Sequence, residues 1–437
     1  TATLLVGLSG SASTLKLDAT GRQVPIVVKD QLTGKPASNV TIKASNTNAK
    51  TDKQGNAVIV VPPKSYTLQA SISADGYLTK QVTLQVTDKV VSANTFTVMP
   101  AGKLFVLSNQ SGKVDVVKMN LDGSARETVL AGLGNETQYA TKLFTAASGK
   151  YVALWSNRDS SEYTELNLIQ TSDGKVTNID KGNAYFTPVG WSGDNFVYVV
   201  SRVGFKNWQP GATSLKSYDA QSNKITVLDS TKATGTFDFD AHYETLPTNS
   251  VTLLGDRIFY TKIWYAYPGY LSVPEQQNTI STVAADGSGR KTIASMAADQ
   301  GYYDSPLQNA VNSLLVEQYK TDGSQQVLYK YTVDGSFQKD TSQSDAAKMR
   351  TRYNNESLGY FTSPDGKRTV WSESRDGKFL TQIGSTATQE SQQLISGEYT
   401  VYGWYTNNYI LLTKKSNELY VLSLNGGTPQ KVTDYYR

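Results

Sequence analysis

The residues best suited to acid–base chemistry surround the single histidine of the chain, His242, in the stretch F-D-F-D-A-H-Y-E at 237–244. If the carboxylate of Asp240 oriented the imidazole, His242 could act as a general base at neutral pH. A serine nucleophile would need a G-x-S-x-G motif at a strand–helix turn, and the stretches at 7–11 and 190–194 lack that spacing. A loop histidine bonded to a neighbouring carboxylate is the simpler interpretation, so we expect no catalytic residue.

Acidic side chains offer a second kind of chemistry. Two carboxylates on either side of a glycosidic bond can hydrolyse it, and their separation is set in space rather than along the sequence. Solvated surface charges explain the same residues more simply. A glycan-active enzyme therefore stays as an alternative, with these carboxylates: Asp238, Asp240, Glu244, Glu275 and Asp304.

Aromatic side chains gather near these carboxylates in three stretches of the chain. Four large aromatics exposed together would approach the largest apolar patch of an ordinary monomer, roughly 300–600 Å². They either pack on one another as a small loop core or bind a protein or a sugar. The candidates for ligand binding are Phe205, Trp208, Asp240, His242, Tyr243, Trp264, Tyr265, Tyr267 and Tyr270.

The composition excludes several other functions. The chain has no cysteine and one histidine, which rules out Cys-based zinc and iron–sulfur sites, thiol catalysis and any metal site with two histidine ligands. Its 42 basic and 38 acidic residues give a net charge of +4, too small for a nucleic-acid-binding protein. We therefore expect no cofactor, no metal and no nucleic-acid partner.

Most of the sequence alternates between apolar and polar residues with a period of two, between clusters of Gly, Asp, Asn and Ser. This pattern predicts an all-β fold of strands joined by tight turns. In a four-stranded antiparallel unit, the second-to-third turn and the link to the next unit lie on one face, which we call the long-loop face. Long loops on one side of a rigid scaffold are where binding usually occurs. The long connections predicted for this face are 203–213, 231–248, 264–278, 297–306 and 342–356.

Beyond Pro100 the strands repeat in units of about 50 residues, which is typical of the four-stranded blade of a β-propeller. Seven units fit residues 102–433, and we predict seven blades, with six and eight as alternatives. The first unit lacks an innermost strand, which residues 94–100 or a late strand would complete. Recurring Asp-Gly turns mark the units at 122–123, 173–174, 286–287 and 334–335.

The best-preserved turn of these repeats is S-P-D-G-K-R-T-V-W at 363–371, and degraded forms occur at 147–150 and 192–195. On this motif the repeats, over about 102–433, resemble the TolB-type β-propeller family. The resemblance implies the fold and not a subfamily, because TolB itself would carry a mixed α/β N-terminal domain. The Pro-Asp-Gly motif ties a hairpin, and we read no chemistry from it.

Residues 22–99 follow a different rhythm, with six predicted strands that each have one apolar face. Such strands favour two sheets packed face to face, a small β-sandwich. The strands are predicted at 24–29, 39–44, 56–61, 65–74, 77–86 and 93–98. The stretch T-G-K-P-A-S-N-V-T-I-K-A at 33–44, followed by T-D-K-Q-G-N at 51–56, resembles the carboxypeptidase-regulatory-like (transthyretin-like) sandwich. The resemblance implies an accessory module and not a catalyst.

We therefore expect two domains, a β-sandwich at 1–99 and a β-propeller at 100–437. The chain starts at Thr1 rather than Met, which a removed signal peptide or membrane anchor would explain. The polar composition favours an extracytoplasmic location, secreted or anchored at the surface of a bacterial envelope. The predicted function is non-enzymatic binding of a protein or glycan on the long-loop face. The alternatives are the glycan-active enzyme and a structural cell-envelope protein.

Overall fold

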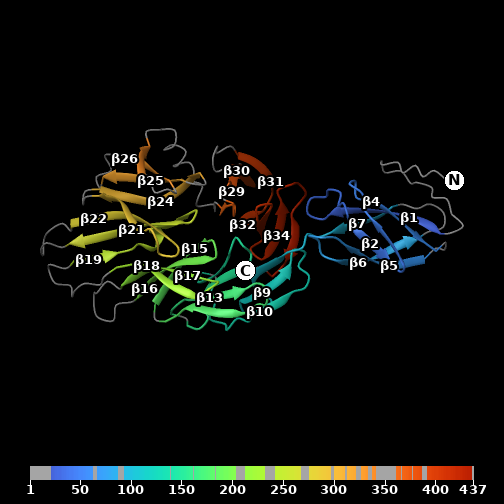
Figure 1. Cartoon of the computed structure of the whole chain (residues 1–437), viewed down its shortest axis with the longest axis horizontal. Helices are drawn as coiled ribbons and strands as arrows, with labels where there is room; N and C mark the ends of the chain where they lie inside the picture. The colour runs from blue at the N-terminus through green and yellow to red at the C-terminus, as the bar shows by residue number, and fades with distance from the viewer. Residues whose placement is uncertain are drawn as a thin grey trace.

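The structure, a computed structural model, is built almost entirely of β-strands (Figure 1). The described part contains one short 3-10 turn, Thr248–Ser250, and none of its helices is long and apolar enough to cross a membrane. The all-β fold predicted from the period-two alternation is confirmed. The structure describes residues 21–62, 66–86, 93–137, 139–160, 162–182, 184–202, 212–231, 242–266, 275–296, 300–310, 313–320, 326–332, 337–340, 361–365, 367–375, 377–385 and 391–435.

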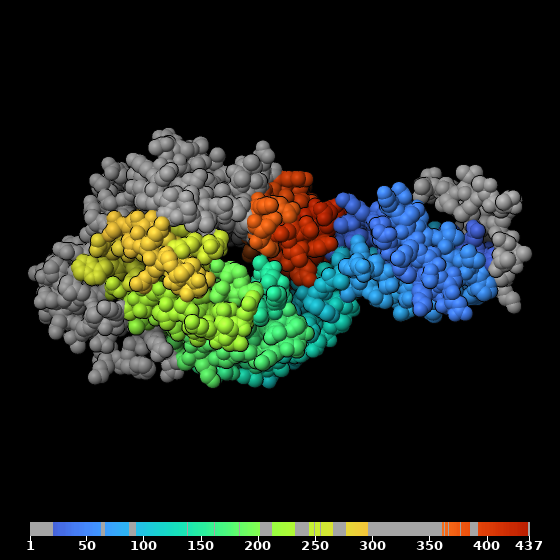
Figure 2. Space-filling view, viewed as in Figure 1, coloured from blue at the N-terminus to red at the C-terminus, as the bar shows by residue number. Residues whose placement is uncertain are grey.

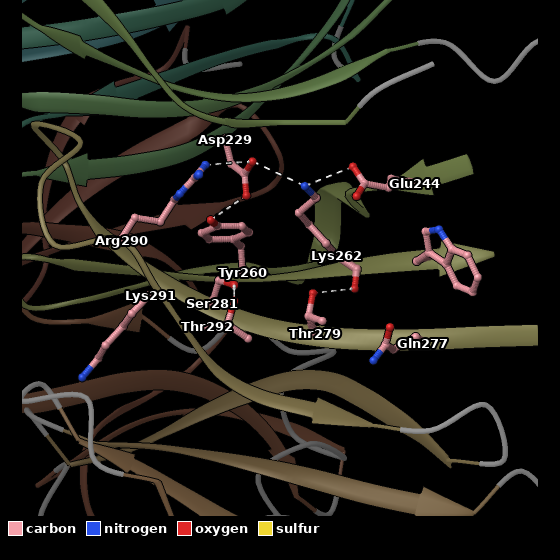
Figure 3. A pocket seen from close by; sticks show the side chains of 11 residues that line it. Asp229, Glu244, Tyr260, Lys262, Gln277, Thr279, Ser281, Arg290, Lys291 and Thr292 are labelled. Atoms are coloured by element: carbon pink, nitrogen blue, oxygen red, sulfur yellow. Dashed lines mark hydrogen bonds and ion pairs between the residues drawn. The ribbon is translucent and has the colours of Figure 1, made fainter. Parts of the chain in front are cut away.

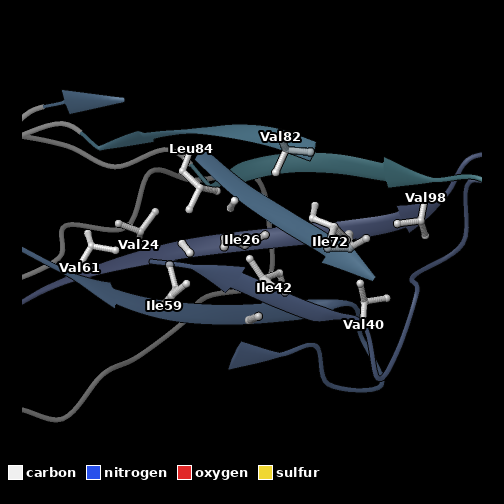
Figure 4. Packing of buried hydrophobic residues seen from close by; sticks show 14 of the residues in the cluster. Val24, Ile26, Val40, Ile42, Ile59, Val61, Ile72, Val82, Leu84 and Val98 are labelled. Carbon is white, nitrogen blue, oxygen red and sulfur yellow. The ribbon is translucent and has the colours of Figure 1, made fainter. Parts of the chain in front are cut away.

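The N-terminal unit contains two sheets, which bury a shared apolar core between them (Figure 4). Alternate residues of the first strand, such as Val24, Ile26 and Val28, point into this core and are fully buried, because successive side chains of a strand face opposite sides. One sheet has the order β4 (Asn56–Val61), β1 (Arg22–Asp30) and β7 (Asn94–Val98); the other has the order β3 (Thr47–Lys50), β2 (Thr41–Ala44), β5 (Tyr66–Ser73) and β6 (Lys80–Val86). Strand β3 was not predicted, since T-N-A-K has no apolar alternation.

Seven further sheets follow in chain order within the described residues, and each is antiparallel. Sheet one is β8 (Lys103–Ser108), β9 (Asp115–Asn120) and β10 (Glu127–Leu130); sheet two is β11 (Thr141–Thr145), β12 (Tyr151–Ser156), β13 (Glu165–Gln170) and β14 (Val176–Asp180); sheet three is β15 (Ala184–Ser192), β16 (Asn195–Arg202), β17 (Thr213–Asp219) and β18 (Lys224–Ser230). Sheet four is β19 (His242–Thr245), β20 (Val251–Leu254), β21 (Arg257–Ala266), β22 (Glu275–Ala284) and β23 (Lys291–Met296).

The last three sheets complete the series. Sheet five is β24 (Gln300–Ala310), β25 (Ser313–Lys320), β26 (Gln326–Thr332) and β27 (Phe337–Asp340); sheet six is β28 (Phe361–Thr362), β29 (Arg368–Arg375), β30 (Lys378–Ser385) and β31 (Ser391–Ser396); sheet seven is β32 (Thr400–Thr406), β33 (Tyr409–Lys414), β34 (Glu418–Ser423) and β35 (Gln430–Thr433). This is a β-propeller. The side chains of sheet five lie outside the described part, so the seven-blade count stays a prediction.

Neighbouring sheets of the propeller are joined by apolar side chains. Separate clusters connect sheet one to sheet two, two to three, three to four, and six to seven. A further cluster connects sheet one to sheet seven. Because the first and last sheets meet, the chain curves back on itself as a propeller requires.

Sheet one has three strands, and within the described residues no fourth strand pairs with β8. The prediction that residues 94–100 complete this sheet is wrong for strand β7, which pairs in parallel with β1 of the N-terminal unit. The physical reason is packing: Val98 is fully buried in the N-terminal core, and Phe96 packs against it. In the described part of the chain, the first and last sheets are therefore held together by side-chain packing and a backbone hydrogen bond from the N–H of Asn109 to the carbonyl of Tyr435 (3.3 Å), rather than by a shared strand.

The contact between sheets one and seven, which we call the seam, includes side chains from the N-terminal unit. Leu32, in the turn after β1, and Met99, after β7, are both buried there. The carboxylate of Asp30 accepts hydrogen bonds from the backbone N–H of Leu32 (2.9 Å) and of Thr33 (2.7 Å), which fixes the turn. Figure 2 shows the N-terminal unit as a separate lobe that meets the propeller in this region. The other buried members are Leu104, Val106, Val117, Met119, Leu121, Leu411, Leu419, Val421 and Val432.

Several residues predicted in long loops lie in strands instead. Trp264 and Tyr265 lie near the end of strand β21, and His242 and Tyr243 begin strand β19, which pairs with β21. Glu244, Glu275 and Asp304 likewise lie in β19, β22 and β24, and the predicted loop 297–306 becomes strand from Gln300. Aromatic residues fit the pleated surface of a sheet, and cross-strand pairing here extends the strands beyond the expected turns.

Candidate functional site

A hollow of about 420 Å³ lies against one face of sheet four, on the side of sheet three (Figure 3). Its lining is mostly polar and comes from five strands and the segment between β22 and β23. We call it the sheet-four hollow. The residues that line it are Asp229, Glu244, Tyr260, Lys262, Trp264, Gln277, Thr279, Ser281, Arg290, Lys291 and Thr292.

The period of the strands explains why these side chains meet. Tyr260, Lys262 and Trp264 occupy alternate positions of β21, so they share one face of the sheet. Their partners across β22 are Ser281, Thr279 and Gln277, in that order, and residues directly opposite each other in a sheet lie on the same side. Two neighbouring strands therefore place six side chains in the hollow.

Four charged side chains form a row of alternating sign across the hollow (Figure 3). Nη1 of Arg290 lies 3.2 Å from Oδ1 of Asp229, and Nζ of Lys262 lies 3.4 Å from the same oxygen. Nζ of Lys262 also lies 3.2 Å from Oε2 of Glu244. Asp229 belongs to sheet three and the other three residues to sheet four, so the row also joins the two sheets. We call these four residues the charged row.

Tyr260 lies beneath this row and is 1% exposed. Its hydroxyl donates a hydrogen bond of 2.7 Å to Oδ2 of Asp229. Burial, followed by the hydrogen bond and the negative charge of Asp229, raises the pKa of Tyr260 above its ordinary value. Tyr260 is therefore a neutral hydrogen-bond donor at physiological pH and is not available as a base.

Hydroxyl groups line the lower part of the hollow. The Oγ atom of Ser281 lies 3.3 Å from Oγ1 of Thr292, and the hydroxyl of Thr279 donates to the backbone carbonyl of Lys262 at 3.3 Å. Nε2 of Gln277 donates to the hydroxyl of Ser295 at 2.9 Å. The hollow thus combines carboxylates, cations, hydroxyls and one indole ring.

Among the residues predicted from the sequence, the structure brings Trp264 and the carboxylate of Glu244 into the hollow. The backbones of Tyr243 and Tyr265 lie directly opposite each other in β19 and β21, and His242 lies opposite Ala266. The side chains of His242, Tyr243 and Tyr265 are outside the described part. Other predicted residues lie outside the described residues altogether: Phe205, Trp208, Asp238, Asp240, Tyr267 and Tyr270.

Apart from Glu244, the polar residues of the hollow were not predicted, because most of them lie within strands and the predicted site residues were all expected in loops. Asp229 could have been found, since it ends K-I-T-V-L-D at 224–229, which repeats K-V-T-N-I-D at 175–180. Lys262 and Gln277 carry a weaker signal, as polar residues on one face of an alternating strand. Within the described residues, no group of three or more His, Cys, Asp or Glu side chains is placed to hold a metal ion.

Comparisons with known proteins are consistent with the propeller architecture but distant. No family model matches the sequence, and no curated protein matches it. Among solved structures, an oligogalacturonate lyase in complex with manganese is 10% identical, with a TM-score of 0.39 over 93% of this chain and 98% of that one. The β-propeller domain of the Trilobed protease from Pyrococcus furiosus is 13% identical, with a TM-score of 0.42 over 85% and 96%. TolB from Acinetobacter baumannii is 11% identical, with a TM-score of 0.31 over 82% and 80%.

Likenesses at this level carry no argument about ligand or activity. The functional case therefore rests on the side chains of the hollow.

Proposed function

We propose that the chain is a non-enzymatic binding protein outside the cytoplasm, which recognises a protein or glycan ligand on the long-loop face of its propeller. The observation that carries the proposal is the sheet-four hollow. It lies on a sheet whose backbone is fixed on both sides by pairing, so that its side chains are already positioned before a ligand arrives.

The position of Trp264 connects the hollow to the long-loop face. Trp264 lies two residues before Ala266, the last residue of its strand, and the connection to β22 follows at 267–274. By the strand order of sheet four, this second-to-third connection belongs to the long-loop face. A ligand bound there would contact the indole ring, and tryptophan is among the residues that most often dominate binding energy.

The proposed location rests on composition. The chain lacks cysteine and is rich in Thr, Ser, Asn, Gln and Tyr. A reporter test decides it: the full-length gene product fused to a phosphatase that is active only after export should give activity in intact bacterial cells. A fusion that stays inactive and cytoplasmic would contradict the location without affecting the hollow.

Substituting both Trp264 and Tyr267 with Ala tests the binding role. We expect the fluorescently labelled variant to lose binding to washed cells of the producing organism, while its melting temperature stays unchanged. Phe379→Ala is the matched control, because Phe379 is an exposed aromatic (46%) on sheet six, away from the hollow. Equal binding by the double variant and the control would refute the proposal.

The two carboxylates of the charged row keep the enzymatic alternative testable. Lys262 lies between Asp229 and Glu244, so both are held within one site. Incubation of the protein with oligosaccharides, followed by mass spectrometry, should recover them intact. Cleavage that is lost in Glu244→Gln would support the glycan-active enzyme and overturn the non-enzymatic proposal.

A further inference from the structure

Sheets three and four repeat the same inter-sheet contact. Tyr198 is the fourth residue of β16, and Tyr260 is the fourth residue of β21. Each tyrosine is buried, and each hydroxyl donates to an aspartate on the last strand of the preceding sheet, at 3.1 Å for Asp180 and 2.7 Å for Asp229. Tyr198 and Tyr260 therefore occupy equivalent positions in the two sheets, and the residues paired with them can be compared directly.

The residue opposite the tyrosine differs between the two sheets. In sheet three, Tyr198 pairs with Lys216, whose Nζ lies 2.7 Å from Oδ2 of Asp180. In sheet four, Tyr260 pairs with Ser281. In sheet three a long lysine side chain reaches the aspartate from this position. In sheet four a short serine stands at this position, Lys262 and Arg290 reach Asp229 from other positions, and the space beside the serine belongs to the hollow. Ser281, Tyr260 and Asp229 all line the sheet-four hollow.

The chemistry around this open space suits hydroxyl groups. A sugar hydroxyl both donates and accepts, so two neighbouring hydroxyls fit a carboxylate placed next to a cation. The charged row provides such neighbours along its length, with Asp229 between Arg290 and Lys262, and Glu244 beyond. The hydroxyls of Ser281 and Thr292 add weaker donors and acceptors below.

The lining also argues against a peptide side chain. A pocket for an apolar anchor would be lined mainly by aliphatic and aromatic groups. Here Trp264 is the one tryptophan among the lining residues, and most of the others are charged or carry amides or hydroxyls. An indole ring beside hydrogen-bonding groups matches the two sides of a sugar ring, an apolar face of C–H groups and an edge of hydroxyls.

We propose that Ser281 opens a sugar-binding slot in sheet four, and that the ligand of the long-loop face is a glycan held through vicinal hydroxyls by the charged row. This inference rests on the proposed binding function and narrows its ligand from a protein or glycan to a glycan. Sheet three fills the same position with Lys216.

Ser281→Lys tests the slot by giving sheet four the side chain that sheet three already carries. The introduced ammonium would be the third cation beside Asp229, after Lys262 and Arg290, so the melting temperature of the variant is measured first to show that it folds. In the folded variant the lysine side chain should close the slot, as Lys216 fills the matching position in sheet three. Gln393→Lys, on an exposed position of β31 in sheet six, adds the same charge away from the hollow and is the matched control. Glu244→Gln is a second variant, since it removes one charge of the row at a half-buried position with little change of shape.

The probe is a printed array of neutral, amino and uronic oligosaccharides, with and without mild periodate oxidation, which cleaves vicinal diols. The wild type and Gln393→Lys should bind at least one glycan and lose that binding after oxidation. Ser281→Lys and Glu244→Gln should lose about tenfold or more in affinity. Undiminished binding by both folded variants would overturn the slot.

Failure of this inference can be told apart from failure of the binding function. If cell binding depends on Trp264 but resists periodate and disappears after protease treatment of the cells, the ligand is a protein and the sugar slot is wrong. The same conclusion follows if cell binding is intact and no glycan on the array is bound. If cell binding does not depend on Trp264 at all, the proposed function itself is wrong.

Discussion

Leu32→Ala should destabilise the propeller although Leu32 belongs to the N-terminal unit. Leu32 is 0% exposed and is buried in the seam between sheets one and seven. Within the described residues no shared strand joins these two sheets, so side-chain packing provides most of the contact between them. Removing the leucine side chain leaves a cavity in this contact between the first and last sheets.

The expected loss of stability follows from the buried side-chain atoms that the substitution removes. Leu→Ala at fully buried positions costs about 2–5 kcal/mol, made up of lost transfer free energy and the remaining cavity. Tryptophan fluorescence isolates the effect, because all 6 tryptophans lie beyond residue 150, in the propeller. Urea denaturation of the full chain should therefore show the tryptophan-reported midpoint shifted to lower urea. If the N-terminal unit were only a spacer, that midpoint would not move.

Two neighbouring glycines provide a second, independent check of the seam. Gly426 and Gly427 both have positive φ, at 111° and 96°. A Cβ on Gly427 would lie 1.9 Å from the backbone oxygen of Leu32, whereas a Cβ on Gly426 would meet nothing within 4 Å. In both Ala variants the positive φ strains the backbone and lowers the free energy of unfolding by about 1–2 kcal/mol. The overlap with Leu32 should lower it by about 1–3 kcal/mol more in Gly427→Ala. Equal midpoints for the two variants would show that the Leu32 turn does not rest on sheet seven.

Three further outcomes follow from individual contacts. Burial, and then the negative charge of Asp30, raise the pKa of Tyr77 from 10.0 to about 12. The protonated tyrosine therefore stabilises the folded state below pH 10.0, and this stabilisation is lost as the pH rises from 10.0 to about 12. The melting temperature should fall less steeply over that interval in Tyr77→Phe, and identical slopes would contradict the assignment. Lys216→Ser should cost about 1–3 kcal/mol in urea denaturation, because Asp180 loses its cation while remaining mostly buried (16% exposed); no loss would show that the pair is not formed. The hydroxyl of Ser363 donates to Asp365 at 2.6 Å and lowers the pKa of that carboxyl. The ionised carboxylate therefore stabilises the folded state, and this stabilisation is lost as the pH falls below the ordinary aspartate range, so Asp365→Asn should show a smaller acid-induced loss of stability than the wild type.

Local sequence signals predicted much of the fold. Strand 56–61 was predicted with the bounds it has, because its apolar alternation begins directly after Gly55, whose φ of 75° makes a turn. The Asp-Gly turns that mark the propeller repeats contain glycines with positive φ, for example 77° at Gly123 and 75° at Gly174. Such turns depend on a few neighbouring residues, so the sequence alone can identify them.

Contacts between distant strands could not be predicted in the same way. Trp264 was expected in a loop, because the pairing of β19 with the end of β21 is set by tertiary packing. Within the charged row, Asp229 contacts Lys262, which is 33 positions away in the sequence, and Arg290, which is farther still. No local pattern specifies that these side chains meet. Leu32 gave no signal at all, since one leucine in a turn has no periodicity. Its role depends on the sheet that it meets.

Hydrogen–deuterium exchange tests the central claim most directly, with the wild-type chain measured alone and with the oligosaccharide that binds best on the array. Binding in the sheet-four hollow should slow exchange in peptides covering β21 and β22, which supply six of its side chains. It should leave unchanged the turns at 171–175 and 220–223, which join third to fourth strands on the opposite face. Protection confined to those turns, with β21 and β22 unaffected, would contradict the account.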